Sequence, residues 1–258
     1  MRVTVLGCGP SAGVPAIGGG WGACDPANPK NQRRRPSVLV EGAGTRVLVD
    51  TSPDLREQFL ATGVAAIDAV LYTHDHADHV HGIDDLRVVR RHVKRNIDVY
   101  AAPEVLDRIT RRFGYLFAGR EAMDALYRPI CEPHVIEGPF RVGGLQVVPL
   151  AQDHGICPSL GFRFGRFAYS TDVVVLPEET LTALAGIDTW IVDCLRDGDP
   201  HPTHANLATT LDWIARVKPR HAVLTHMNHQ SDYETLRAHL PPGVEPAYDG
   251  MVLEVPDG

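Results

Sequence analysis

Short apolar runs rich in β-branched residues recur along the chain and alternate with segments of helical spacing. A run of this kind, bounded by turn residues, is typical of a buried strand. Proline in the first turn of a helix costs no hydrogen bond, so Pro53, Pro103 and Pro177 predict helix starts. Apolar residues at helical spacing predict two more helices, over 80–92 and 206–217. The predicted strands are 2–6, 37–41, 46–50, 69–72, 98–101, 145–150, 160–164, 166–170, 190–193, 221–224 and 251–255.

One loop of this pattern is unusually rich in groups that bind metals. It lies between the strand predicted at 69–72 and the helix predicted at 80–92, and it reads Thr73-His74-Asp75-His76-Ala77-Asp78-His79. Imidazole nitrogens and carboxylate oxygens are the ligands that zinc and similar divalent metals prefer. A loop between a strand and a helix is also a usual position for catalytic groups.

Three single residues, His154, Asp172 and His226, also follow predicted strands closely. Each of them alone is more often an ordinary polar residue than a ligand. Strand ends on one edge of a sheet converge in space, however, and α/β enzymes build sites from such ends. Together with the histidine-rich loop, these residues predict a metal site.

Length and charge limit what the chain can be. Its 258 residues suit one large α/β domain or two compact ones, and no low-complexity linker divides them, so we expect a single domain over residues 1–258. The formal net charge of −7 argues against general nucleic-acid binding. A small phosphorylated substrate, held by a few arginines, remains compatible with it. No apolar run approaches the roughly 18 residues that cross a membrane, and the first strand begins without a leader. We therefore expect a cytoplasmic protein that binds no membrane.

The five cysteines are odd in number and widely spaced, and no CxxC pair occurs. This pattern indicates neither a disulfide framework nor a four-cysteine zinc site. We expect reduced thiols, as is usual in the cytosol.

The motif HxHxDH, followed by isolated His, Asp and His residues, resembles the metallo-β-lactamase fold hydrolases over essentially the whole chain. The resemblance implies an α/β fold, the αββα sandwich, with two mixed β-sheets packed face to face and helices outside. It also implies two divalent metal ions, zinc or manganese. The implied ligands are His74, His76 and His154 for one ion, Asp78, His79 and His226 for the other, and Asp172 as the bridge.

The same resemblance implies the chemistry. Two divalent ions lower the pKa of a bridging water towards 7, which supplies hydroxide as the nucleophile at neutral pH. Asp78 could accept a hydrogen bond from that hydroxide in addition to binding metal, so we treat it as catalytic too. Asp50, at the end of the strand predicted at 46–50, matches the acid that orients a ligand imidazole in this family. A simple turn carboxylate is the alternative for Asp50.

Further segments resemble the PhnP-like phosphodiesterases within this superfamily. They are the glycine-rich opening 5–15, the run 203–207 that contains His204, the run 224–230 and the run 248–251. This resemblance implies cleavage of a small, cyclic or nucleotide-like phosphodiester, with His204 as the general acid for the leaving alkoxide. A histidine of near-neutral pKa suits that role. The family's structural zinc needs a cysteine trio, and only Cys24 is present in the first long loop. We therefore expect no structural zinc.

Other functions remain open on the same residues. A tRNase Z-like endoribonuclease would need a basic arm, which neither long loop provides, and a thioester or lactone hydrolase would use the same ligands. A nucleotide sensor without turnover is a further alternative. The run Arg33-Arg34-Arg35 predicts a solvated face or, alternatively, a phosphate clamp. The aromatic excursion 113–139, with Phe113, Tyr115, Phe117 and Tyr127, predicts a homodimer surface or a lid.

Overall fold

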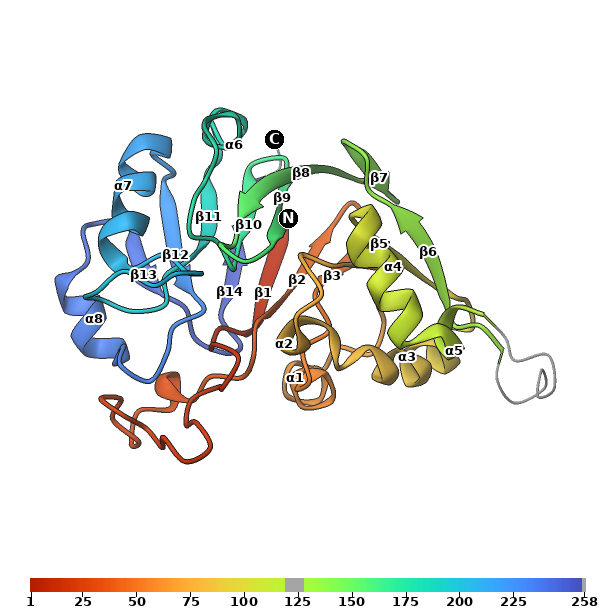
Figure 1. The fold of residues 1–258 in the computed structure, drawn as a ribbon, viewed down its shortest axis with the longest axis horizontal. Helices are drawn as coiled ribbons and strands as arrows, with labels where there is room; N and C mark the ends of the chain where they lie inside the picture. The colour runs from red at the N-terminus through yellow and green to blue at the C-terminus, as the bar shows by residue number, and fades with distance from the viewer. Residues whose placement is uncertain (119–127, 257–258) are drawn as a thin grey trace.

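The computed structural model describes residues 1–118 and 128–256, and it contains two mixed sheets that pack face to face (Figure 1). The first sheet has the order β14 (Val252–Glu254), β1 (Arg2–Gly7), β2 (Ser37–Gly42), β3 (Thr45–Val49), β4 (Ala69–Leu71), β5 (Ile97–Ala101) and β6 (Cys131–Val135). The second has the order β13 (Val244–Pro246), β12 (His221–Thr225), β11 (Thr189–Asp193), β10 (Phe167–Ser170), β9 (Pro158–Phe164), β8 (Leu145–Asp153) and β7 (Phe140–Val142).

The two sheets share one pairing pattern. In the first, β14, β1, β2 and β3 are antiparallel, whereas β3 to β6 run parallel. In the second, β7 to β10 are antiparallel, whereas β10 to β13 run parallel. Helices connect the strands of each parallel half. Because these strands run in the same direction, their carboxyl ends lie along the same side of each sheet.

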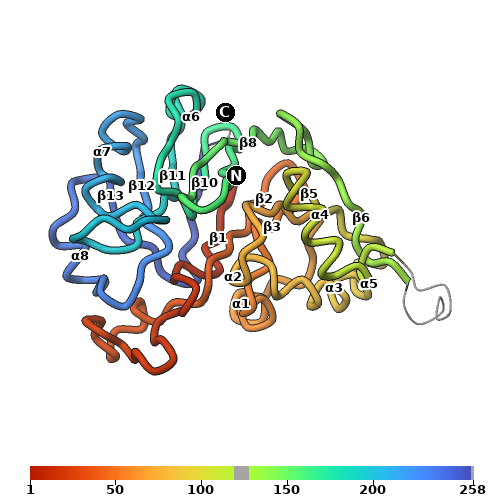
Figure 2. Tube along the Cα trace, viewed as in Figure 1, coloured from red at the N-terminus to blue at the C-terminus, as the bar shows by residue number. Residues whose placement is uncertain are grey.

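Helices cover the outer face of each sheet, as Figure 2 shows in outline. The first sheet carries α1 (Leu55–Thr62), α2 (Ala77–Val80), η2 (Ile83–Asp85), α3 (Leu86–Val93), α4 (Pro103–Arg112) and α5 (Gly114–Phe117). The second carries α6 (Glu178–Ala183), α7 (Leu207–Val217) and α8 (Tyr233–His239), and η1 (Pro29–Asn31) lies in the first long loop. The predicted αββα sandwich is therefore confirmed.

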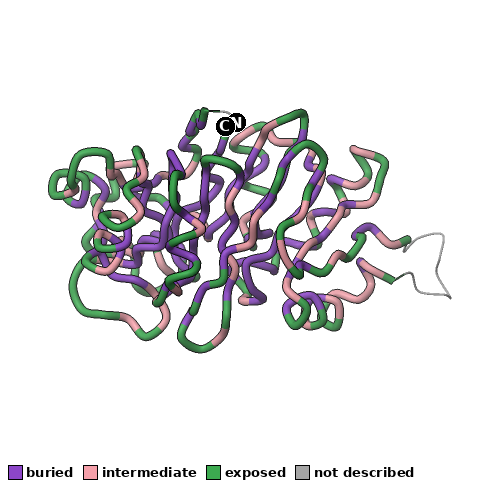
Figure 3. Tube along the Cα trace, turned by 90° about the horizontal axis from the view of Figure 1, so that it is seen from above, coloured by how far each residue is buried: buried purple, intermediate pink, exposed green. Residues whose placement is uncertain are grey.

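Strand alternation explains why this sandwich forms. Successive side chains of a strand point to opposite faces. In β2, Val38 and Val40 belong to the core between the sheets, while Leu39 belongs to the separate core beneath α1 to α5. In β3, Val47 and Leu48 divide in the same way. Buried segments, drawn in purple, run through the middle of the molecule in Figure 3, and exposed segments lie mostly at its periphery.

Every predicted strand is present, but three strands escaped prediction. β6, β7 and β13 all lie at sheet edges, where burial is one-sided or weak. β6 also contains Pro133, and proline is tolerated in strands mainly at edges. An apolar-run criterion therefore misses them.

The helix predicted at 80–92 is interrupted. α2 ends at Val80, and the chain passes through Gly82 and η2 before α3 begins at Leu86. The Gly82 amide donates to the Thr51 carbonyl at 2.9 Å, and a Cβ at Gly82 would lie 2.0 Å from the Ser52 carbonyl oxygen. This close approach of two backbones breaks the helix and packs the segment after the histidine-rich loop against the end of β3.

The aromatic excursion is partly accounted for. Phe113, Tyr115 and Phe117 are half-buried and pack against the core beneath the first sheet's helices, and the Tyr115 hydroxyl donates to Asp84 at 2.8 Å. Tyr127 lies outside the described residues. Within the described part of the chain, no helix is long and apolar enough to cross a membrane.

Candidate metal centre

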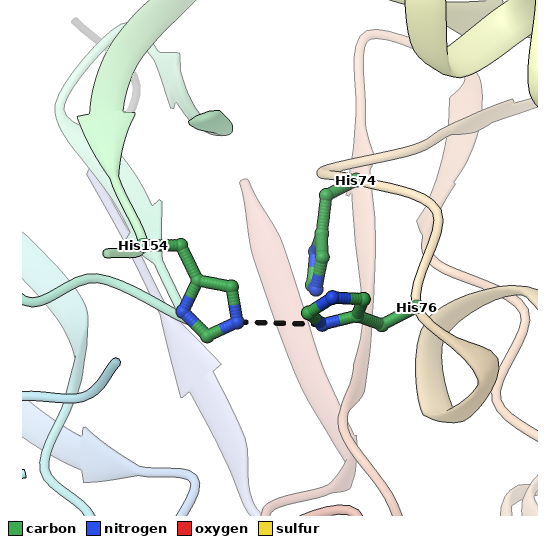
Figure 4. A group of neighbouring side chains, drawn as sticks. All are labelled: His74, His76 and His154. Carbon is green, nitrogen blue, oxygen red and sulfur yellow. Dashed lines mark hydrogen bonds between the residues drawn. The ribbon is translucent and has the colours of Figure 1, made fainter. Parts of the chain in front are cut away.

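Residues far apart in sequence meet at one edge of the sandwich. The loop after β4 provides His74 and His76, and the short helix α2 provides Asp78 and His79. Residues just beyond the ends of three strands of the second sheet complete the set, namely His154 after β8, Asp172 after β10 and His226 after β12. Figure 4 shows His154 facing His74 and His76 across the gap between the sheets. The structure thus brings all seven predicted ligand residues together.

The possible ligand atoms of these seven residues fall into two neighbouring groups, and His204 forms two further groups with some of them and with Asp193. Within each group, one nitrogen or carboxylate oxygen of every residue lies within 4.8 Å of the others. The first group is His74, His76 and His154, and the second is Asp78, His79, Asp172 and His226. These groups match the division that the family resemblance implied.

Asp172 lies between the two groups and presents one oxygen to each. Its Oδ1 is 3.6 Å from His154 Nε2 and 3.9 Å from His74 Nε2. Its Oδ2 is 3.1 Å from His79 Nε2 and 3.5 Å from His226 Nε2. A carboxylate in this position can bridge two cations.

Several observations fit this donor set to divalent metal ions. His154 Nε2 and His76 Nδ1 are 3.3 Å apart, and two nitrogens on a tetrahedral zinc lie about 3.3 Å apart as well. The Nε2 atoms of His74, His79 and His226 are buried without a hydrogen-bond partner among the described residues. Buried polar atoms are normally satisfied, so these nitrogens are free to coordinate.

The pKa values of the buried histidines also fit a site that binds metal ions. Burial lowers the pKa of His74 and His154, which keeps their imidazoles neutral as ligands must be. Burial also lowers the pKa of His79, but Asp172, Asp78 and Asp50 outweigh it and raise that pKa well above its usual value. The carboxylates around His79 therefore require positive charge, and a bound cation would replace the proton.

Hydrogen bonds behind the ligands fix their rings. Asp50 Oδ2 accepts a bond from His79 Nδ1 at 2.7 Å, and Asp50 also accepts from the Thr73 amide and hydroxyl, both at 2.9 Å. Because the Thr73 hydroxyl donates to Asp50, it accepts from His74 Nδ1 at 3.0 Å. Each arrangement leaves Nε2 facing the centre. Asp50 is thus placed to orient the His79 imidazole, and it is not a simple turn carboxylate.

His204 lies beside the two groups and has a partner that sequence analysis missed. Its Nε2 is 3.9 Å from Asp172 Oδ1, and its Nδ1 is 3.4 Å from Asp193 Oδ2. Burial lowers the pKa of His204, but Asp193 and then Asp172 outweigh it and raise that pKa to about 9. The sequence did contain a signal for this partner, because Asp193 stands at the end of an apolar strand, as Asp50 does.

Three residues of the centre have left-handed backbones, which side-chain-bearing residues adopt reluctantly. The φ angles are 65° for Asp50, 54° for Asp172 and 62° for His226. Such conformations cost of order 1–3 kcal/mol each and persist where the surroundings over-determine them. Their concentration here indicates that the fold holds these side chains in place at the expense of local stability.

The arginine run does not form the expected solvated face or a phosphate clamp. Arg33 is 1% exposed, and its guanidinium donates to the Ser231 carbonyl at 2.7 Å and the Asn228 carbonyl at 3.1 Å. Arg34 pairs with Asp249 at 3.5 Å and Arg35 with Asp54 at 2.8 Å. Arg33 instead joins the first long loop to the loop that follows His226.

The fold and this donor set define a metallo-hydrolase. A family model described as "Beta-lactamase superfamily domain" matches residues 45–227, and the chain belongs to that superfamily. A solved structure described as a new diphosphatase from the PhnP family aligns with a TM-score of 0.90 and 35% identity, covering 99% of this chain and 98% of that one. The chain is accordingly a PhnP-like member of the superfamily, as its sequence predicted.

Curated relatives carry several different names. An octanoyltransferase of Porphyromonas gingivalis (strain ATCC BAA-308 / W83) is 36% identical over 97% of this chain and 51% of its own length. A ribonuclease Z of Bradyrhizobium sp. (strain ORS 278) is 33% identical over 67% of this chain and 56% of its own length. The chain therefore spans about half the length of these relatives. Zn²⁺-bound PqqB from Methylobacterium extorquens, at a TM-score of 0.76 and 20% identity, shares the fold.

Proposed function

We propose that this chain is a dinuclear-metal phosphodiesterase that acts on a small phosphorylated substrate. The observation that carries the proposal is Asp172, which faces both ligand groups with separate oxygens and lies 3.9 Å from His204. When bound, two divalent ions would lower the pKa of water to near 7 and neutralise charge that develops on a phosphoryl group. The seven ligand residues named above would hold them.

The protein's own groups would then divide the remaining work. His204 is aimed at the centre from the second sheet and would give its proton to the leaving alkoxide, since Asp193 keeps the imidazole protonated at neutral pH. Asp78 lies with its Oδ2 3.4 Å from His79 Nε2 and 3.7 Å from His226 Nε2. It would therefore bind metal and also orient the attacking water.

The names of relatives support phosphoryl chemistry more than acyl chemistry. The PhnP-family structure that covers 98% of its own chain is called a diphosphatase, and ribonuclease Z cleaves phosphodiesters in RNA by name. The octanoyltransferase name denotes acyl transfer, and the chain matches about half of that relative, as it does of the ribonuclease Z, so the PhnP-family structure carries the preference. The acyl function is thus the alternative to test.

A substrate panel separates these functions. Purified protein, supplied with zinc or manganese, is assayed with bis(p-nitrophenyl) phosphate, a thioester, a lactone and a precursor tRNA. We expect turnover of the phosphodiester. Turnover of the thioester or lactone alone would contradict the proposal, and processing of precursor tRNA at a higher kcat/KM would make the chain an endoribonuclease.

Metal content tests the ligand set independently of activity. Elemental analysis of metal-replete protein should give two divalent ions per chain. Asp172→Ala should lose both, because it removes the only carboxylate that faces both described ligand groups. His204→Ala should keep both and is the matched control. Fewer than one ion per wild-type chain would disprove the dinuclear site.

Leaving-group dependence tests the role of His204. General acid catalysis contributes about 10²–10⁴-fold, so His204→Ala should lower kcat by that factor for a diester with an alkoxide leaving group. With p-nitrophenolate, which leaves without a proton, the loss should be much smaller. Equal losses for both substrates, at unchanged metal content, would show that His204 binds substrate and does not protonate it.

A further inference from the structure

The loop that links β11 to α7 carries a second histidine beside His204. In the run 200–204, His201 and His204 stand three positions apart. Their ring centroids are 5.4 Å apart, and the ring planes meet at 39°. His204 Nε2 is in turn 3.9 Å from Asp172 Oδ1, the oxygen that faces the first ligand group. His201 thus lies beside the metal centre, and the proposed division of catalytic work leaves it unused.

Backbone contacts hold this loop against the metal centre. The Thr203 carbonyl accepts a hydrogen bond from Nδ1 of the ligand His154 at 2.6 Å. A Cβ at Gly155 would lie 2.2 Å from the Pro202 carbonyl oxygen, so the turn after His154 packs directly on the loop. Because both contacts use the backbone of residues next to His201, they fix where its ring lies relative to the ligands.

Thr203 also determines which nitrogen of His201 carries the hydrogen. The Thr203 amide, which can only donate, is 3.3 Å from His201 Nδ1, and the Thr203 hydroxyl is 3.2 Å from the same atom. Nδ1 therefore accepts. Burial lowers the pKa of His201, and the charges of His204 and Arg196 lower it further, so the ring is neutral at pH 7. A neutral imidazole whose Nδ1 accepts carries its hydrogen on Nε2.

This Nε2–H group is a donor that the protein itself does not use. Within residues 1–118 and 128–256, His201 Nε2 has no hydrogen-bond or ion-pair partner. The residue is half-buried, so a ligand can reach the ring from solvent. A neutral donor adds no charge to the site. It therefore distinguishes substrates by whether they offer an acceptor oxygen, because a ligand without one leaves the donor unpaired.

We infer that His201 is a specificity residue for the leaving group, and that its Nε2–H binds an uncharged oxygen on the carbon next to the one that bears the scissile oxygen. His204 gives its proton to the leaving alkoxide, and donors on two adjacent rings can reach two oxygens on adjacent carbons. The site prefers leaving alcohols with a neighbouring ether or hydroxyl oxygen to plain alkyl alcohols. This inference rests on the proposed phosphodiesterase function, because it concerns the leaving group of the same reaction.

Two dialkyl phosphates of equal charge and similar shape provide the test. Bis(2-methoxyethyl) phosphate has an ether oxygen on the carbon next to each ester carbon, whereas dibutyl phosphate has a methylene there. Each is measured as a competitive inhibitor of bis(p-nitrophenyl) phosphate turnover by metal-loaded protein at pH 7. His201→Phe keeps a ring but no donor, so it should raise the Ki of the methoxyethyl diester about 3–10-fold, the loss of one neutral hydrogen bond. The Ki of dibutyl phosphate and the KM of the chromogenic substrate should stay within about twofold, since neither has an oxygen at that position.

Three further variants make the result specific. His201→Gln places an amide N–H near the position of Nε2, so it should recover part of the affinity for the methoxyethyl diester. His201→Ala should show the same selective loss as His201→Phe, without a ring that could displace the loop. His92→Phe removes an exposed histidine of α3 and should change neither Ki. An unchanged Ki of the methoxyethyl diester in both His201→Phe and His201→Ala would overturn the inference. An equal rise for the two diesters would overturn it too, because His201 would then only support its neighbours.

Failure of the proposed function gives a different result. If wild type turns over no phosphodiester, calorimetric titration of metal-loaded protein with the two diesters measures the same affinities. A loss confined to the methoxyethyl diester in His201→Phe would support the donor role of His201 on a protein of other activity. Equal affinities in wild type and variant, or binding of neither diester, would overturn that role.

Discussion

Replacing Arg33 with methionine would remove a buried charge that joins two loops. The Arg33 guanidinium donates to the carbonyls of Ser231 and Asn228 and to Asn31 Oδ1, at 2.7, 3.1 and 3.3 Å, and it lies 3.8 Å from the Cys24 sulfur. No carboxylate lies within 4.0 Å of it among the described residues. Arg33 is therefore stabilised by neutral oxygens alone.

The expected loss follows from these contacts. The variant leaves the Ser231 carbonyl without a donor, whereas the Asn228 carbonyl and Asn31 Oδ1 still accept from the amides of Ser231 and Tyr233. An unsatisfied buried carbonyl costs about 1–3 kcal/mol, and relief of the guanidinium's own desolvation offsets part of the lost hydrogen bonds. We therefore expect Arg33→Met to lower the free energy of unfolding by about 1–3 kcal/mol.

Urea unfolding of metal-free protein measures this loss without a contribution from metal binding. Arg237→Met is the control, since its side chain is 58% exposed and its ion pair is with the equally exposed Glu234, so it should cost under about 1 kcal/mol. The loop that Arg33 holds follows His226 directly, so Arg33→Met should also weaken metal retention. A loss below about 1 kcal/mol at unchanged m-value would refute the reasoning.

Three further changes follow from other contacts. Cys24→Ser should leave metal content unchanged and cost under about 1 kcal/mol in urea unfolding, since Cys24 makes only weak sulfur hydrogen bonds and a structural zinc ligand would cost far more. Asp193→Asn should lower the pKa of His204 and reduce kcat for alkoxide-leaving diesters about tenfold at pH 8, with metal content retained; an unchanged kcat would contradict this. Burial raises the pKa of Asp249 to about 6, against about 3.9 in an unfolded chain, so its stabilising contribution is full below pH 4 and is lost as pH rises through 6. The stability of wild type relative to Asp249→Asn should therefore fall by about 3 kcal/mol between pH 4 and pH 7, and a flat difference in urea unfolding would count against it.

Much of the fold was predictable because its signals are local. The central strands are short apolar runs that are buried on both faces, so their composition alone distinguishes them from loops. The edge strands β6, β7 and β13 lack that signal, because only their pairing with a neighbour makes them strands. Gly82 interrupted a periodic helix for a similar reason, since the backbone it approaches belongs to a distant segment.

In the candidate metal centre, too, the locally encoded features were predictable and the contacts between distant segments were not. The sequence by itself determined the ligand types and their attachment to strand ends, because an HxHxDH spacing and residues that follow buried strands are visible without coordinates. Only the tertiary structure decided that Asp193 faces His204 and that Arg33 is buried against the loop after His226. These partners lie on different elements, and burial and charge pairing between elements depend on how the chain packs, which local composition does not encode.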